Sequence, residues 1–220
     1  MISASGGGST SVDCTGADAL FVFITSGGGG TEVEGVTATY NGVSMDIKFT
    51  DTTHATKRCR CFRLLMPASG SNSLALTWSG ASSMVVVAIP MASVNQSTPD
   101  GSQVAADGSS GGTSSSINIP DTTANDIVLD FVTSSNGITG LTQGANQTSL
   151  NIQSGHGSGA NASGCSYEVG GGTPNVMSWT WNEFAVYFGW AFAVYGASGA
   201  TGPAPRDNTK RRFFFRGIRR

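Results

Sequence analysis

Charged residues, histidines and cysteines are scarce in this 220-residue chain, and each shortage narrows what the protein can be. Charged residues make up 12% of the sequence, and there are two histidines and four cysteines with no CxxC pair. Because zinc sites use clustered cysteine and histidine ligands, we expect no metal. The glycine clusters lack the strand–turn–helix context of a phosphate-binding loop, so we expect no cofactor either.

Long apolar runs and a leader segment are also missing. The aromatic-rich run at residues 184–195 is well short of the ~20 apolar residues that a membrane helix requires. Residues 1–10 are rich in glycine and serine and show neither the cationic start nor the apolar centre of a signal peptide. A composition with few charges and many hydroxyl and amide side chains is common in virion surface proteins. We therefore expect a virion component that assembles in the cytoplasm of a bacterial host, with its cysteines reduced. These are Cys14, Cys59, Cys61 and Cys165.

Catalytic motifs are the third absence. The two histidines, His54 and His156, lie far apart in polar segments, and no G-x-S-x-G elbow accompanies them. Paired carboxylates are the basis of glycosidase activity. The candidates for such a pair are Asp126, Asp130, Glu168 and Glu183. Turn positions explain Asp126 and Glu183 adequately, so we expect no catalytic residue and no enzyme activity. A hydrolase is the third hypothesis, and it requires one of the histidines beside a nucleophile.

Period-2 alternation is what the sequence does contain, and it is clearest in residues 184–195. The bulky residues occupy the even positions: Phe184, Val186, Phe188, Trp190, Phe192 and Val194. Mostly small residues fill the odd positions, which predicts one β-strand with its large face in a core and a bend near Gly189. A helix is the rival interpretation, since Phe184, Phe188 and Phe192 are also spaced at i, i+4 and i+8. The aromatic and β-branched content favours the strand.

Other segments extend the β pattern. Residues 20–24 and 84–89 are continuously apolar, as in strands that are buried on both faces. Asn41-Gly42, between two alternating segments, predicts a hairpin with a type I′ turn. In the strand predicted over residues 58–66, basic residues share a face with apolar ones, which predicts a β-bulge there.

About twelve short strands separated by turn residues, with no convincing helix, predict an all-β fold. The expected architecture is an antiparallel β-sandwich of jelly-roll type over residues 1–197. The four tryptophans are in phase with apolar neighbours, so we expect them in the core rather than on a sugar-binding surface. Residues 94–116 are expected to be a polar passage, followed by a short strand at Ile117 and Ile119. Residues 143–162 are expected to be a loop with one short strand near Leu150 and Ile152, and Asn182-Glu183 is expected to be a turn.

Residues 198–220 differ sharply in charge from the rest. From position 201 onward the chain has seven basic residues and one acidic residue, a net charge of +6, which leaves −8 for the remainder. We predict an extended C-terminal arm that binds a partner. Its binding residues are Arg206, Lys210, Arg211, Arg212, Phe213, Phe214, Phe215, Arg216, Ile218, Arg219 and Arg220. An acidic protein surface is the favoured partner, because aromatic residues and arginine are enriched at protein interfaces. Nucleic acid is the second choice, and a membrane surface ranks third and is not expected.

Four segments of the body together resemble a known family. They are VTATYNGVSM at 36–45, MPASGSNSL at 66–74, SVNQSTP at 93–99 and DIVLD at 126–130. In order and spacing they resemble a β-sandwich family found among tailed-phage virion proteins and phage-like bacterial sequences, with a match over residues 9–197. The resemblance implies a virion structural protein, such as a capsid decoration (cement) protein or a tail-associated protein. It implies no catalytic residue, and the basic tail lies outside it.

The expected function is therefore that of a non-enzymatic phage protein, a capsid decoration or cement protein that binds and stabilises the assembled shell. Its expected partner is the major capsid protein or another virion protein, and we expect it to form a homo-oligomer such as a trimer. The alternative is a tail- or fibre-associated receptor or carbohydrate-binding module. That alternative predicts exposed aromatic residues in glycine-rich segments.

Overall fold

The structure is a computed structural model. It describes residues 5–26, 35–51, 59–79, 83–120, 122–134, 138–156, 161–171, 174–197, 204–205 and 212–216. Every regular element within these ranges is a β-strand, and the strands form antiparallel sheets that pack together. The predicted all-β sandwich is thereby confirmed, and its jelly-roll strand order stays a prediction. None of the described segments forms a helix long and apolar enough to span a membrane.

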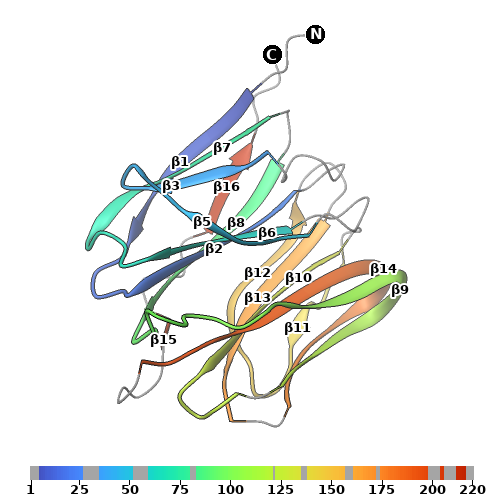
Figure 1. The fold of residues 1–220 in the computed structure, drawn as a ribbon. Coiled ribbons are helices and arrows are strands. Elements are labelled where there is room, and N and C mark those ends of the chain that lie inside the picture. The colour runs from blue at the N-terminus through green and yellow to red at the C-terminus, as the bar shows by residue number, and fades with distance from the viewer. Residues whose placement is uncertain are drawn as a thin grey trace. The chain divides into compact units, whose positions relative to one another are not determined.

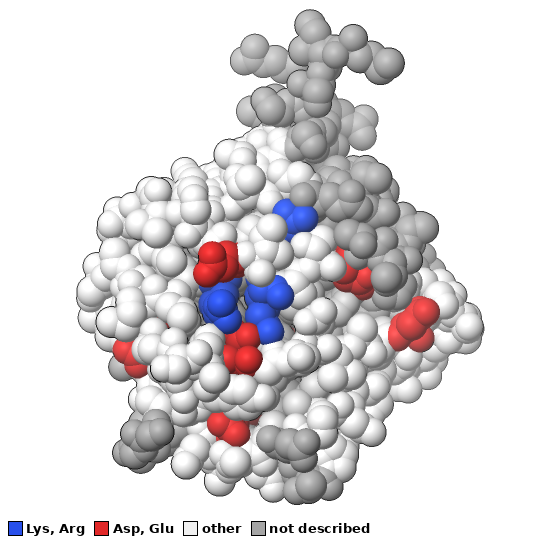
Figure 2. All heavy atoms as spheres, in the orientation of Figure 1, with Lys and Arg blue, Asp and Glu red and all other residues white. Residues whose placement is uncertain are grey.

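The chain packs into two compact units. One consists of Met1–Met91 together with Pro205–Arg220, and the other of Ala92–Ala204. The sequence analysis expected one domain over residues 1–197 followed by a separate arm. In the structure, the C-terminal residues instead group with the N-terminal part of the chain. Figure 2 shows one face on which few described side chains are charged; basic groups near its centre lie beside acidic ones, and most of this face is uncharged.

The first unit is a sandwich of two antiparallel sheets (Figure 1). Its strands are β1 (Ser5–Asp13), β2 (Ala19–Ser26), β3 (Thr37–Tyr40), β4 (Val43–Ser44), β5 (Asp46–Thr50), β6 (Cys59–Leu65), β7 (Ser71–Ser79), β8 (Ser83–Ala92), β15 (Ala204–Pro205) and β16 (Arg212–Arg216). One sheet has the order β1-β7-β3-β4. The other has the order β15-β8-β2-β6-β5, with β16 also paired to β8.

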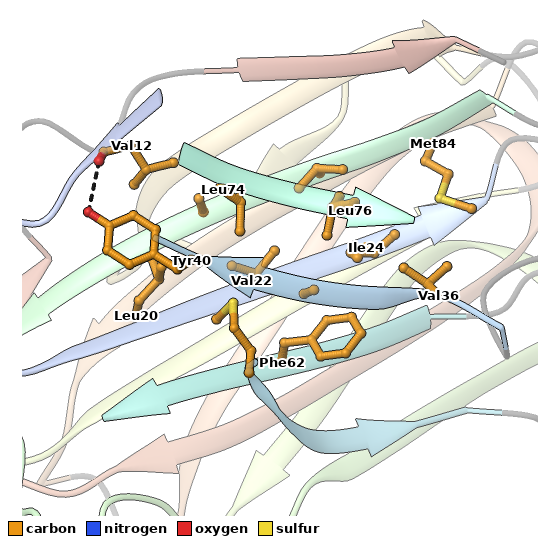
Figure 3. Close-up of a cluster of buried hydrophobic side chains, with 14 of the residues drawn as sticks. Val12, Leu20, Val22, Ile24, Val36, Tyr40, Phe62, Leu74, Leu76 and Met84 are labelled. Carbon is orange, nitrogen blue, oxygen red and sulfur yellow. Dashed lines mark hydrogen bonds between the residues drawn. The ribbon is translucent and has the colours of Figure 1, made fainter. Parts of the chain in front are cut away.

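A cluster of buried side chains from both sheets forms the core of the first unit (Figure 3). It takes alternate residues from each strand, for example Leu20, Val22 and Ile24 of β2. Alternation follows from the pleat, which points successive side chains to opposite faces. The intervening Phe21 and Phe23 are fully buried as well, which confirms the prediction of a strand that is buried on both faces.

Two local predictions for the first unit have different outcomes: the hairpin is confirmed and the bulge is wrong. Asn41 and Gly42 have φ of 49° and 77°, and the flanking Tyr40 and Val43 pair, so the type I′ hairpin is confirmed. The predicted bulge in residues 58–66 is wrong, because the register shift lies on the neighbouring strand, between Ile47 and Phe49 of β5.

The contacts of the buried Arg60 side chain explain how β6 accommodates a basic residue without a bulge. The Arg60 guanidinium lies 5.8 Å from the centroid of the Phe62 ring. Its Nη1 donates a hydrogen bond of 2.7 Å to the Val36 carbonyl. Burial also lowers the pKa of Arg60 from its ordinary value. The side chain therefore packs within the regular strand pattern.

The second unit is built on one sheet around its longest strand. Its strands are β9 (Val104–Ile119), β10 (Ile127–Ser134), β11 (Thr142–Gln143), β12 (Thr148–His156), β13 (Asn161–Val169) and β14 (Asn175–Val194). The order is β11-β14-β10-β13-β12, and β9 pairs with β14 along much of its length (Figure 1). The short strands expected near Leu150 and Ile152 and at Ile117 and Ile119 are confirmed as parts of β12 and β9. The expected loops around them are wrong for much of their length, because β9 begins at Val104 and β12 and β13 extend over most of residues 148–169. Their serine, threonine and glycine residues join ladders because partner strands supply the hydrogen bonds.

The predicted strand over residues 184–195 is confirmed, and it begins earlier than expected. Asn182-Glu183 is not a turn but lies inside β14, where the register with β9 shifts. The small face of the strand is closely packed, because Ala191 and Ala193 lie in one buried cluster with Ile117 of β9. A Cβ added at Gly189 would lie only 3.1 Å from Ile117 Cδ1.

Candidate functional site

Part of the predicted arm is a strand at a sheet edge. β16 pairs antiparallel with β8, with Arg212 opposite Val87 and Arg216 opposite Ser83. On its other side β8 pairs with β2, so β16 occupies the remaining edge of β8 along this stretch. Phe213, Phe214 and Phe215 lie within the strand. The other predicted binding residues lie outside the described part of the chain: Arg206, Lys210, Arg211, Ile218, Arg219 and Arg220.

The accepting edge of β8 is apolar. Met84, Val85, Val86 and Val87 are all buried, and an unpaired strand of this kind is a template for other extended chains. Strand addition satisfies its main-chain donors and acceptors whatever the added sequence, while side chains supply specificity. The arm is thus bound through its backbone, which the sequence analysis did not foresee.

A second feature is a pair of bulges in the β9–β14 ladder. Thr180 pairs with Ser114, but the next pairs are Ala185 with Gly112 and Tyr187 with Gly108. Both strands therefore hold extra residues at the same place, β14 between positions 180 and 185 and β9 between positions 108 and 112. Such bulges leave residues unpaired and redirect their side chains.

Aromatic rings of β14 cover the glycines of this β9 segment. A Cβ at Gly111, where φ is +78°, would lie 2.3 Å from the Phe184 ring, and one at Gly108 would lie 2.3 Å from the Tyr187 ring. Trp181 and Tyr187 pack edge to face with centroids 4.9 Å apart, and Trp181 Nε1 donates to the Gly112 carbonyl at 2.9 Å. Glycine is needed at positions 108 and 111 because a side chain there would displace a ring.

Side-chain hydrogen bonds hold the β14 bulge from its other side. The Glu183 carboxylate accepts from the Thr139 backbone N–H at 2.6 Å and from the Thr139 hydroxyl at 2.5 Å. These bonds hold the pKa of Glu183 below its ordinary value. The Asn182 N–H donates to the Thr139 carbonyl at 3.1 Å. We call Gly111, Thr139, Asn182, Glu183 and Phe184 the bulge platform.

Phe184 is where the sequence analysis was wrong about a buried residue. It was expected on the inward face with Phe188 and Trp190, and those two are buried, but Phe184 is 70% exposed. The bulge interrupts the alternation of inward and outward side chains along β14. Phe184 therefore does not share the buried face of Phe188 and Trp190. The four tryptophans, in contrast, are all buried as predicted. The sequence signal that could have indicated the exposure of Phe184 is the polar Asn182-Glu183 pair just before it, which faces a glycine-rich partner strand.

The carboxylates considered for a glycosidase have structural partners. Asp130 is 1% exposed. It accepts hydrogen bonds from the Ser166 N–H at 2.9 Å, from Trp179 Nε1 at 2.5 Å and from Gln147 Nε2 at 3.2 Å. Burial raises the pKa of Asp130 to about 7 despite these donors. A carboxyl enclosed in this way stabilises a polar centre of the sheet and has no access to a substrate.

The remaining carboxylates also lie in local hydrogen-bonded structure. Asp126 accepts from the Thr123 N–H at 2.7 Å and from the Gly196 N–H at 3.1 Å. Burial raises the pKa of Glu168, which accepts a bond of 3.3 Å from Asn175. Asp126 closes a turn, as expected. Glu183 instead anchors the β14 bulge.

The other candidate residues of the sequence give no further site. His54 and the side chain of His156 lie outside what the structure describes. All four cysteines are buried. Among the described residues, no group of three or more histidine, cysteine, aspartate or glutamate side chains is close enough to hold a metal ion.

Comparisons with known proteins add little. No protein-family model matches the chain, and no curated protein sequence matches it. One solved structure, described as an anti-sigma factor domain-containing protein, is 12% identical over 93% of this chain and 84% of its own, with a TM-score of 0.25. A likeness at that TM-score supports no conclusion about fold or function.

Proposed function

We propose that this chain is a non-enzymatic structural protein of a phage virion, a decoration or cement protein that binds the assembled shell and stabilises it. The observation that carries the proposal is the pairing of β16 with β8. A terminal arm that binds as an added strand is a general means of joining protein subunits, because main-chain hydrogen bonds work for any extended partner. Added interface area between shell subunits then stabilises the particle.

Charge supports the same role for the tail. The basic residues that flank β16 in the sequence contribute to the +6 charge of the tail. An acidic surface on the major capsid protein or on a neighbouring copy matches them, since complementary charge steers association and fixes register. The proposed partners are thus virion proteins, including further copies of this chain in a homo-oligomer, and the proposed location is the virion.

Particle occupancy tests the proposal. Labelled full-length chain is mixed with purified particles lacking it, and the bound copies are counted after sedimentation. We expect saturable binding by the full chain, and loss of binding both by a chain ending at Pro205 and by a chain with Phe213, Phe214 and Phe215 replaced by threonine. The threonine variant preserves β propensity, so it serves as the better-folded comparison.

The possible outcomes separate the two parts of the proposal. If the full chain does not bind particles, the structural role is wrong. If both variants bind at the occupancy of the full chain, the particle-binding role of the arm is wrong. Circular dichroism of each variant shows whether its body remains folded.

A second candidate function is a tail- or fibre-associated receptor or carbohydrate-binding module. One observation favours it: an aromatic ring, that of Phe184, is exposed over a glycine-rich segment. This is the feature that the alternative predicted, although on a residue that was expected in the core.

A further inference from the structure

We propose that the bulge platform binds neutral carbohydrate, with the exposed Phe184 ring stacking on the face of a sugar. The inference goes beyond shell binding, and it applies equally to a protein on the head or on the tail. It rests on the second unit alone, since β9, β14 and Thr139 all belong to residues 92–204.

The support of the Phe184 ring is the first argument. At 70% exposure it is the most exposed of the large hydrophobic side chains that the structure describes. Its ring packs against the backbone at Gly111, and the residue before it is fixed to Thr139 by two hydrogen bonds. An apolar ring held in this way in water is preorganised, so little conformational entropy is lost when a ligand binds it.

The polar residues beside Gly111 in the sequence and those bonded at the β14 bulge fit a polyol. Ser109, Ser110 and Thr113 of β9 are exposed. Thr139 and Asn182 are exposed as well, and the Asn182 amide donates to the Thr139 hydroxyl at 3.3 Å. Hydroxyl and amide side chains both donate and accept hydrogen bonds, as sugar hydroxyls require. An aromatic surface surrounded by such groups matches a sugar, which has an apolar C–H face and a polar edge.

Charge narrows the class of ligand. Residues 107–114, 138–142 and 180–188 contain Asp107 and Glu183 and no lysine or arginine. Anionic sugars and nucleic acid would meet carboxylates without a compensating cation, whereas phosphate recognition depends on lysine and arginine. A protein partner typically needs about 800 Å² with an apolar centre, and a single ring among hydroxyl groups is poorly suited to that. Neutral glycans remain as the matching class.

Saturation-transfer difference NMR on the full-length protein tests the proposal. The probes are neutral oligosaccharides of glucose, mannose, galactose and xylose, with oligogalacturonate as the anionic comparison. We expect signals from at least one neutral glycan and none from oligogalacturonate. Phe184→Ala should weaken the affinity about tenfold, the size of one lost aromatic contact. Phe184→Trp, which keeps an aromatic face, should retain binding.

Val176→Ala is the matched control, because Val176 is an exposed apolar residue (46%) on the same strand outside the bulge. Its affinity should stay within twofold of the parent chain. The proposal is wrong if no neutral glycan gives a signal, if oligogalacturonate binds as well as the neutral glycans, or if Phe184→Ala binds like the parent. Since Phe184 is largely exposed, its substitution leaves the fold intact, and particle occupancy measured in parallel reports on shell binding independently.

Discussion

Single residues of this structure are expected to have measurable effects on the free energy of unfolding, and Asp130 is the clearest case. Burial raises the pKa of Asp130 to about 7, against about 3.9 in an unfolded chain. Between these values the folded protein holds a proton that the unfolded chain has released. The contribution of Asp130 to the free energy of unfolding is therefore fully present below about pH 4, and it is lost as the pH rises through 7.

Asp130→Asn removes this titration. We expect the free energy of unfolding of the parent chain to fall more steeply between pH 4 and 8 than that of the variant, by at most about 1.4 kcal/mol per pH unit. Urea unfolding at several pH values provides the measurement. Parallel pH profiles for the two chains would contradict the assignment, whatever the difference in their absolute stabilities.

Tyr40 is a second residue with a definite energetic role. Its buried hydroxyl lies 3.0 Å from the carbonyls of Val12 and Gly70 and accepts a bond of 3.3 Å from Asn72 (Figure 3). Burial raises the pKa of Tyr40 to about 12. Tyr40→Phe should destabilise the protein by about 1 kcal/mol, since it removes the hydrogen bonds of a buried hydroxyl. An unchanged urea midpoint and slope would show that the hydroxyl contributes nothing.

At the scale of elements, the β9–β14 ladder depends on where its glycines lie. A Cβ at Gly108 would lie 2.3 Å from the Tyr187 ring, whereas one at Gly112 would have its nearest contact at 3.4 Å. We expect Gly108→Ala to cost about 1–3 kcal/mol of stability through overpacking, and Gly112→Ala much less. Thermal unfolding of the two variants side by side is the measurement, and equal losses would contradict the described packing.

The edge of β8 gives the second prediction about an element. A chain ending at Pro205 lacks β16, so the backbone of Met84–Val87 in β8 loses its partner strand on that edge. We expect increased aggregation, measured by static light scattering, together with a lower Tm than that of the full chain. A truncated chain that scatters light no more than the full chain and has an unchanged Tm would show that β16 does not protect this edge.

Period-2 patterning was enough to predict most of the elements near the core. Leu20 to Ile24, the Asn41-Gly42 hairpin and residues 188–194 follow local rules that the structure obeys. The polar part of β9, residues 104–116, was missed because its pairing with β14 is long-range. Nothing in a polar, glycine-rich segment marks it as a strand by itself. Phe184 was misplaced for a related reason: a bulge depends on the partner strand, so one sequence alone does not say which way the residues within it face.

For the whole molecule, the proposed function combines a weakly charged β body with a basic tail that ends in an edge strand. The tail and the remainder of the chain carry net charges of +6 and −8. If charge contributes to holding the protein on its particle, occupancy should fall as ionic strength rises, because exposed charges are screened within about 10 Å at 0.1 M salt. Occupancy unaffected between 0.05 and 0.5 M NaCl (roughly a threefold change in screening length) would assign attachment to apolar and main-chain contacts alone.

The central claim is that this protein belongs to the particle, and imaging intact virions tests it most directly. Cryo-electron microscopy of purified particles, with and without the chain, should show added density that fits the β-sandwich of the first unit at regular positions on the shell. Particles that are identical with and without the chain, with all of the protein recovered free in the lysate, would contradict the account.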